Sequence, residues 1–491
     1  MACTTILVGK KASYDGSCII ARNDDSGAGN YTPKKYVIIN PKDQPRKYTT
    51  CISHLTIDLE DNPLTYSATP NVNREHGIWC AAGVNSLNVA MSATETITSN
   101  PRVLGADPLV NYIKGDGKKK DIPGGIGEED IVHIILPYIK SAREGVIRLG
   151  SMLEKYGTYE MNGIAFADEK EIWWLETVGG HHFLAKRVED DEYVVMPNQF
   201  GMDEYDLDDG VGKQVKHICS KDMKEFIKDN HLDLSNDDYF NPRLAFGSHD
   251  DSDHIYNTPR AWYMLKYFNP TFCDWESDYR PEDDDLPFSM VPERKITIED
   301  VKYILSSHFQ GTPYDPYLSY GDKSLAGKYR SIGVNRTDDL EIIQLRPYGN
   351  KMTRPIEWQA FGSNVFNVCI PQYTCVDKSP SYLNCTTENV DTNSFYWVSR
   401  LIGAMADASY KDSLNTIERY QLAGASLGNK LINEYDKQFS KLKKKEDISK
   451  LAIKANQNIC DGFEKLSKDA LNKVLKSCSN KMKNAFSRSD A

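Results

Sequence analysis

The sequence predicts an α+β fold that ends in a helical region, and three observations indicate it. Short runs rich in β-branched residues, such as residues 4–8 and 35–39, are separated by turn residues over most of the chain. Residues 128–156 instead repeat apolar side chains at helical spacing. From about residue 392 onward the patterns are helical. Strand-rich and helix-rich stretches therefore precede a largely helical end.

The other elements are justified by the same patterns, taken in chain order. The expected strands cover residues 4–8, 17–21, 35–39, 48–52, 163–166, 171–176, 182–188, 194–198, 331–346 and 354–370, with a strand–turn–strand unit over 77–96. The expected helices cover 128–156 with a break near Pro137, the stretch after 256–262, and residues 296–308, 393–410 and 415–439.

Composition and charge narrow the function classes. The chain has 491 residues, of which 40% are hydrophobic and 26% charged, as is ordinary for a soluble globular protein. No apolar run approaches the ~20 residues that span a bilayer, and no secretory signal is visible at the N-terminus. A net charge of −11 argues against a general nucleic-acid binder. We therefore expect neither nucleic acid nor membrane as a partner.

The cysteines indicate a reducing compartment. There are eleven, an odd number, widely scattered and without the spacing of a zinc site. Free thiols of this kind fit a cytoplasmic enzyme. His181 and His182 do not predict a metal site, because no third ligand lies at a supporting spacing.

The first twenty-five residues hold the clearest functional signal. Cys3 precedes the expected strand 4–8, Asp15-Gly16 marks a tight hairpin turn, and the returning strand 17–21 leads into residues 22–25. Because a hairpin places its two ends side by side, Arg22 and Asp25 are expected near Cys3. A thiol, a guanidinium and a carboxylate would then share one small site.

This arrangement has a chemical logic if Met1 and Ala2 are removed. Cys3 then carries a free α-amine, whose pKa near ~8 lets it accept a proton at neutral pH. The reactive thiolate is favoured by a cation such as Arg22. Asp25 would orient the amine or hold Arg22 in place. The alternative reading of Cys3 is an ordinary buried strand cysteine.

The residues CTTILVGKKAS, DGS and ARNDD resemble peptidase family C69, of the dipeptidase A type. That family belongs to the N-terminal nucleophile (Ntn) hydrolases and is related to choloylglycine hydrolases and penicillin V acylases. The resemblance implies a four-layer αββα sandwich over residues 3–395, a short propeptide at residues 1–2, and a helical C-terminal extension at 396–491. It also implies hydrolysis of dipeptides.

Two further stretches gain candidate roles from this resemblance. Asn198, at the end of a short apolar strand, is similar to the asparagine that stabilises the oxyanion in related acylases. Arg260 resembles a second arginine of such sites, which supports the thiolate or binds a substrate carboxylate. The alternatives are an ordinary turn asparagine and a surface arginine at a helix start.

Thr94 and Glu95 are the substrate-binding candidates. Related sequences carry an oxyanion-hole asparagine near this point, whereas this chain has Ser92-Ala93-Thr94-Glu95. A backbone N–H or the Thr94 hydroxyl would have to replace that asparagine. Glu95 would bind the free ammonium of a dipeptide, and its alternative role is a solvated residue at a strand end.

The sequence therefore predicts a cysteine-type dipeptidase that needs neither metal nor cofactor and that assembles as a homo-oligomer. Two other functions stay open: an amidase or acylase of the choloylglycine or penicillin V type, and a non-catalytic Ntn homologue. The GxSxG pattern at residues 424–428 is set aside as a serine-hydrolase motif, because it falls inside a helical pattern.

Overall fold

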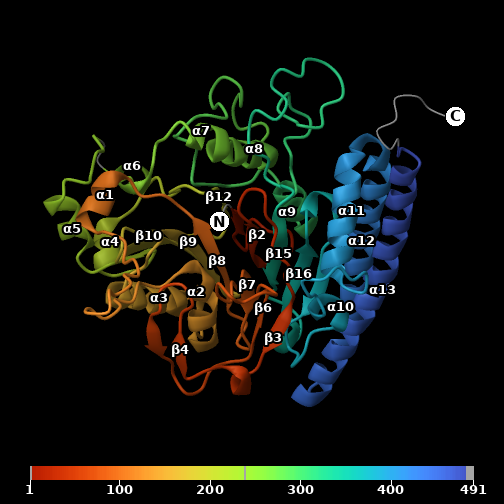
Figure 1. Ribbon diagram of the computed structural model, residues 1–491, viewed down its shortest axis with the longest axis horizontal. Helices are drawn as coiled ribbons and strands as arrows, with labels where there is room; N and C mark the ends of the chain where they lie inside the picture. Colours follow the sequence, from red (N-terminus) through yellow and green to blue (C-terminus); the bar gives the residue numbers. More distant parts are fainter. Residues whose placement is uncertain (1–2, 237–238, 483–491) are drawn as a thin grey trace.

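The fold is α+β, as the sequence predicts, and is built on antiparallel sheets (Figure 1). The computed structural model describes residues 3–236 and 239–482; within this part, the side chain of Thr94 is not described. The expected propeptide, residues 1–2, lies outside the described residues, as does the end of the expected extension. None of the helices in the described ranges has the length and apolar composition needed to cross a bilayer.

Two sheets form the centre of the molecule. One has seven strands in the order β14-β12-β1-β2-β15-β16-β17, and the other has six in the order β13-β11-β10-β9-β8-β7. The seven-stranded sheet contains β1 (Thr4–Val8), β2 (Cys18–Asp25), β12 (Tyr193–Met196), β14 (Ser289–Met290), β15 (Thr337–Leu345), β16 (Pro355–Phe361) and β17 (Ile370–Tyr373). The six-stranded sheet contains β7 (Ala82–Val84), β8 (Ala90–Thr96), β9 (Asn162–Ala167), β10 (Ile172–Val178), β11 (His182–Val188) and β13 (His217–Cys219).

Two small sheets and the helices surround this centre. The small sheets pair β3 (Val37–Ile39) with β6 (Tyr66–Ala68) and β4 (Lys47–Thr49) with β5 (Thr56–Asp58). The first helices are α1 (Pro101–Ala106), α2 (Glu128–Ile135), α3 (Ala142–Tyr156), α4 (Leu207–Val211), α5 (Met223–Asp229), α6 (Pro242–Phe246) and α7 (Asp253–Tyr256). They are followed by α8 (Thr258–Phe268), α9 (Ile298–Leu305), α10 (Ser381–Asn384), α11 (Phe395–Ala408), α12 (Tyr410–Phe439) and α13 (Lys445–Ser479).

Strand alternation explains where the apolar core lies. In β1, Ile6 and Val8 belong to the apolar cluster on the helix-covered face of the seven-stranded sheet, where α9 contacts β1, whereas Leu7 belongs to the cluster that faces the other sheet. A second cluster fills the space between the two sheets, and a third joins the six-stranded sheet to α2 and α3. The two sheets therefore face each other, with helices on both outer faces.

The connection between β1 and β2 is wider than the predicted two-residue turn. The register pairs Val8 with Ile19, so the loop spans residues 9–17, with Gly16 at a φ of 85°. Lys11 and Ala12 donate their backbone N–H groups to the carbonyl of Asp190. The tertiary contact with residue 190 accounts for the wider loop. Strand β2 begins one residue after the expected start, at Cys18, and continues to Asp25, so residues 22–25 belong to the strand rather than follow it.

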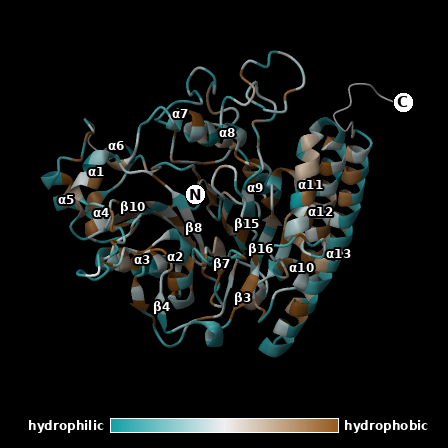
Figure 2. Cartoon of the chain, in the orientation of Figure 1, coloured by the Kyte–Doolittle hydropathy of each residue, from teal (hydrophilic) through white to brown (hydrophobic). Residues whose placement is uncertain are grey.

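The long C-terminal helices are amphipathic, and Figure 2 shows brown and teal residues alternating along them. Helix α12 buries side chains at intervals of three or four residues, among them Ile417, Tyr420, Leu431 and Tyr435. Helices α11–α13 cover β16 and β17 and share one apolar cluster with them. The boundary between a catalytic domain and an extension after residue 395 stays a prediction.

Helix α13 also completes the hydrogen bonding of the edge strand β17. The side-chain oxygen of Asn456 accepts from the backbone N–H of Tyr373 at 2.9 Å. Its amide nitrogen donates to the carbonyl of the same residue, also at 2.9 Å. Asn456 therefore acts as a strand partner for Tyr373, and protects an otherwise open edge.

We expect Asn456→Leu to lower the free energy of unfolding by about 2 kcal/mol, because two buried backbone groups lose their partner. Urea unfolding followed by circular dichroism measures this change. Gln457→Leu, on the exposed side of the same helix, serves as the control and should stay within about 0.5 kcal/mol of the parent. Equal stability of the two variants would contradict the bridging role of Asn456.

Candidate active site

Cys3 lies directly before β1, fully buried, with its thiol against Arg22 of β2. The Nη2 atom of Arg22 is 3.0 Å from the Cys3 Sγ atom. The Nη1 atom donates to the carbonyls of Ala81, at 3.1 Å, and Ala93, at the edge of the six-stranded sheet. The sequence-predicted pair of thiol and guanidinium is therefore brought together, and it sits between the two sheets.

Two carboxylates complete the surroundings of Arg22. Its Nη2 atom lies 3.0 Å from Asp24 Oδ1 and 3.4 Å from Glu128 Oε1. Asp24 also forms an ion pair with Lys34. One potential metal-ligating atom from each of Cys3, Asp24 and Glu128 lies within 4.8 Å of the other two. Because the guanidinium contacts all three, it already takes the place that a metal ion would need.

Asp25 has a different environment from the one expected. Its carboxylate forms an ion pair with Arg330 and accepts from Thr337 Oγ1 at 2.6 Å. Successive strand residues point to opposite faces, so Arg22 and Asp24 share one face of β2 while Asp25 lies on the other. Holding Arg22 in place is thus the task of Asp24 rather than of Asp25.

Arg260 and Asn198 meet beside the main chain of Cys3. In the first turn of α8, Arg260 donates to the Cys3 carbonyl and to Thr4 Oγ1, the latter at 2.7 Å. It also donates to the amide oxygen of Asn198 at 2.8 Å. The Asn198 amide nitrogen in turn donates to the carbonyl of Thr96 at 2.9 Å. Both residues therefore come close to Cys3, and the amide orientation of Asn198 is defined.

Glu95 is buried rather than solvated. Its Oε2 atom accepts from the hydroxyl of Thr5 at 2.9 Å, and its Oε1 atom has no hydrogen-bond partner. Burial raises the pKa of Glu95 to about 8, against the opposing effect of Arg260 and Arg22. The partner candidate Thr94 belongs to β8, but its side chain lies outside the described part of the structure.

Burial also governs the thiol. It raises the pKa of Cys3 to about 12, Arg22 opposes this rise, and Glu95, Asp24 and Glu128 add to it. The thiol is therefore neutral at physiological pH with these neighbours alone. A further positive charge or a base close to Cys3 is needed to form the thiolate.

Several residues of this cluster are absent from the sequence-based selection. Asp24 adjoins the predicted Asp25, but strand alternation was needed to choose between them. Glu128 reaches the site from the first turn of α2, more than a hundred residues away in sequence. Asn257 accepts from Arg260 at 2.7 Å, and Arg330 pairs with Asp25. No local motif marks Glu128 or Arg330.

A buried thiol paired with a guanidinium is suited to nucleophilic catalysis of hydrolysis. Comparison with known proteins identifies the protein's class as peptide hydrolase. The chain belongs to peptidase family C69, whose sequence model matches residues 2–423.

Several relatives match over the whole chain. A dipeptidase of Bifidobacterium longum (strain NCC 2705) is 49% identical, with 100% of both chains covered. A probable dipeptidase A of Streptococcus pyogenes serotype M3 (strain SSI-1) is 48% identical, again with 100% of both covered. A probable dipeptidase B of Lactococcus lactis subsp. lactis (strain IL1403) is 42% identical, covering 100% of this chain and 98% of the relative.

We expect Arg22→Met to slow alkylation of Cys3 by about tenfold near neutral pH, since loss of a cation raises the thiol pKa by about one unit or more. The rate is measured with iodoacetamide and peptide mapping by mass spectrometry. Arg22→Lys keeps the charge, and its alkylation rate should fall between those of the parent and Arg22→Met. Arg187→Met, at an ion pair with Glu171 away from Cys3, is the control. An unchanged or faster rate in folded Arg22→Met would contradict the pairing.

The raised pKa of Glu95 predicts a pH dependence of stability. The folded state holds the proton up to about pH 8, whereas the ordinary value is 4.5, so this contribution is lost as the pH rises between these values. Glu95→Gln keeps an acceptor for the hydrogen bond from the Thr5 hydroxyl but cannot ionise. The unfolding free energy of this variant should therefore decline less between about pH 4.5 and 8. Urea unfolding at a series of pH values measures it, and parallel curves for both proteins would refute it.

Proposed function

We propose that the protein is a cysteine-type dipeptidase in which Cys3 becomes the N-terminal nucleophile after removal of Met1 and Ala2. The observation that carries this proposal is the 3.0 Å contact between the Cys3 thiol and Arg22, in a chain that belongs to peptidase family C69. Dipeptides are proposed as substrates because the relatives with full coverage are named dipeptidases.

The electrostatics support a free α-amine at Cys3. Burial, together with the carboxylates of Asp24 and Glu128, keeps the thiol protonated, and one arginine does not balance them. An α-amine at the same residue supplies both a base for the thiol proton and, once protonated, a second positive charge. The ammonium would also favour the ionised form of nearby Glu95, whose carboxyl is otherwise protonated at neutral pH.

The proposed reaction has two halves. The α-amine takes the proton from Cys3 as the sulfur attacks the scissile carbonyl, and a C–S bond forms. The resulting ammonium protonates the leaving nitrogen, the C–N bond breaks, and the C-terminal amino acid departs. Water then gives a proton to the same amine and attacks the thioester, so that a C–O bond forms and the C–S bond breaks. The second amino acid is released, and the ammonium returns its proton to the sulfur to restore the thiol. Atoms and protons balance without a metal or cofactor.

Asn198 is the proposed hydrogen-bond donor to the oxyanion. The candidates for a second donor are Thr94 and a backbone N–H. The Asn198 amide nitrogen points to the end of β8, the strand that approaches Cys3 through Glu95 and Thr5. Arg260 uses both terminal nitrogens on protein groups. This supports a role in positioning Cys3 and Asn198 over binding of a substrate carboxylate.

The fold supports the same class. Two facing antiparallel sheets with helices on both outer faces, and the candidate nucleophile at the start of a central strand, are what an αββα Ntn-hydrolase sandwich requires. We propose residues 3–395 as its catalytic domain and 396–491 as an extension. Eleven free cysteines favour a cytoplasmic location, and the homo-oligomeric state stays a prediction.

We expect Cys3→Ala to abolish dipeptide hydrolysis, with a loss of at least about a thousandfold, because the covalent step disappears. Cys18→Ala is a matched control, since Cys18 is also buried and has a similarly raised pKa, but no hydrogen bond joins its thiol to an arginine of the described residues. It should retain most of the activity. Full activity of Cys3→Ala would exclude this mechanism.

Intact mass of the purified protein tests the maturation step, and the active form should begin at Cys3. A retained Ala2 in protein of full activity would remove the α-amine from the mechanism, and a retained Ala2 in inactive protein would favour the non-catalytic homologue.

Assays of dipeptides beside bile-salt conjugates and penicillin V separate a dipeptidase from an acylase.

A further inference from the structure

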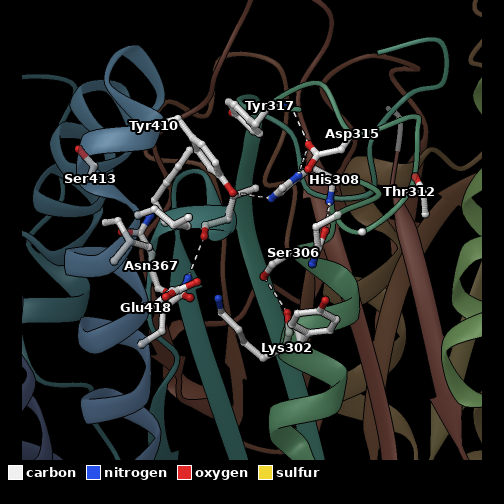
Figure 3. A pocket seen from close by; sticks show the side chains of 18 of the residues that line it. Lys302, Ser306, His308, Thr312, Asp315, Tyr317, Asn367, Tyr410, Ser413 and Glu418 are labelled. Atoms are coloured by element: carbon white, nitrogen blue, oxygen red, sulfur yellow. Dashed lines mark hydrogen bonds and ion pairs between the residues drawn. The ribbon is translucent and has the colours of Figure 1, made fainter. Parts of the chain in front are cut away.

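A cavity of about 1100 Å³ lies between α9, the loop at residues 308–325 and α12. Figure 3 shows it as a space between the helix that carries Lys302 and the helix that carries Glu418. None of the candidate active-site residues lines it. Its volume is close to the upper end of the range of small-molecule sites, so there is room for a ligand away from the candidate active site.

Lys302 gives the cavity a cationic group that the protein itself does not neutralise. From α9 its side chain extends into the space between the two helices (Figure 3). Its Nζ atom donates to the carbonyl of Asn364 at 3.1 Å, and no carboxylate of the described residues forms an ion pair with it. Burial lowers the pKa of Lys302 to about 8, so the group is still mostly charged at neutral pH. An ammonium with one carbonyl partner can bind an anion.

An aromatic wall stands above Lys302. The rings of Tyr317 and Tyr410 are stacked with centroids 3.9 Å apart and an interplanar angle of 8°. The Tyr410 hydroxyl lies 3.2 Å from His308 Nε2, and His308 Nδ1 lies 2.9 Å from Asp315. These contacts hold the wall in place (Figure 3). Ile298, Trp358, Val368 and Ile417 add apolar surface to a lining that also contains polar side chains.

The acidic groups around the cavity do not neutralise the positive charge of Lys302. Asp315 is used by His308, and Glu299 accepts from Asn429 at 2.6 Å. Asp322 accepts from Ser324, at the exposed loop, and Glu418 is exposed on α12. The thiol of Cys369 is the one titratable neighbour in the described chain that affects the pKa of Lys302.

We propose that this cavity is a binding site for a small organic carboxylate with a flat apolar body. The carboxylate pairs with Lys302, and the apolar body lies along the tyrosine wall and the aliphatic lining. An aromatic amino acid released by peptide hydrolysis belongs to this chemical class, but the binding proposal does not depend on the proposed function. The charge of the unpaired ammonium and the planar wall are the two features that select the ligand.

Isothermal titration calorimetry of the full-length protein tests this proposal, with 3-phenylpropanoate as the probe and neutral 3-phenylpropanamide for comparison. We expect the carboxylate to bind with one site per chain and the amide to bind at least about tenfold more weakly, because it lacks the charge-assisted hydrogen bond. Lys302→Met should weaken carboxylate binding by a similar factor, and Lys302→Arg should keep most of it.

Lys430→Met, at an exposed lysine on α12, is the matched control and should bind as the parent does. Lys302→Met removes a half-buried charge without changing the side-chain volume much, so it should fold, and thermal unfolding checks this. The proposal is overturned if the carboxylate fails to bind the parent up to about 10 mM. It is equally overturned if the amide binds as well, if Lys302→Met binds like the parent, or if a second copy of the chain fills the cavity in solution.

Discussion

The contact on which the site depends is the buried guanidinium of Arg22. Its nitrogen atoms meet the Cys3 thiol and Asp24 on the seven-stranded sheet, the carbonyls of Ala81 and Ala93 on the other sheet, and Glu128 on α2. A buried charge that loses its partners costs several kcal/mol. The two sheets must therefore pack in the one alignment that brings all of these groups to Arg22, and the same alignment places the thiol.

A second arginine cluster supports the opposite face of β2. Arg330 pairs with Asp25, and Arg260 holds the Cys3 carbonyl and Asn198, while both guanidinium groups lie 5.1 Å from the ring centroid of Tyr256. One short strand thus carries two sets of ionic contacts, one between the sheets and one toward the helices. This explains why two neighbouring aspartates, Asp24 and Asp25, have different partners and different expected roles.

The C-terminal helices are tied into the same architecture. They share an apolar cluster with β16 and β17, and Asn456 completes the hydrogen bonds of the sheet edge. The cavity around Lys302 forms where α12 passes α9. The helices therefore stabilise the sheet that carries Cys3 and also create a ligand-sized space away from it.

The sequence by itself determined the α+β class, most of the longer strands, the helices α2, α3, α8, α9, α11 and α12, and the pairing of Cys3 with Arg22, because these depend on local periodicity and on the two ends of one hairpin. It also excluded the GxSxG pattern, which lies inside α12. Tertiary structure alone decided that Asp24 rather than Asp25 holds Arg22, that Glu95 is buried, and that Glu128 and Arg330 join the site. Those choices depend on which faces of distant elements meet, and residue spacing along the chain does not encode that.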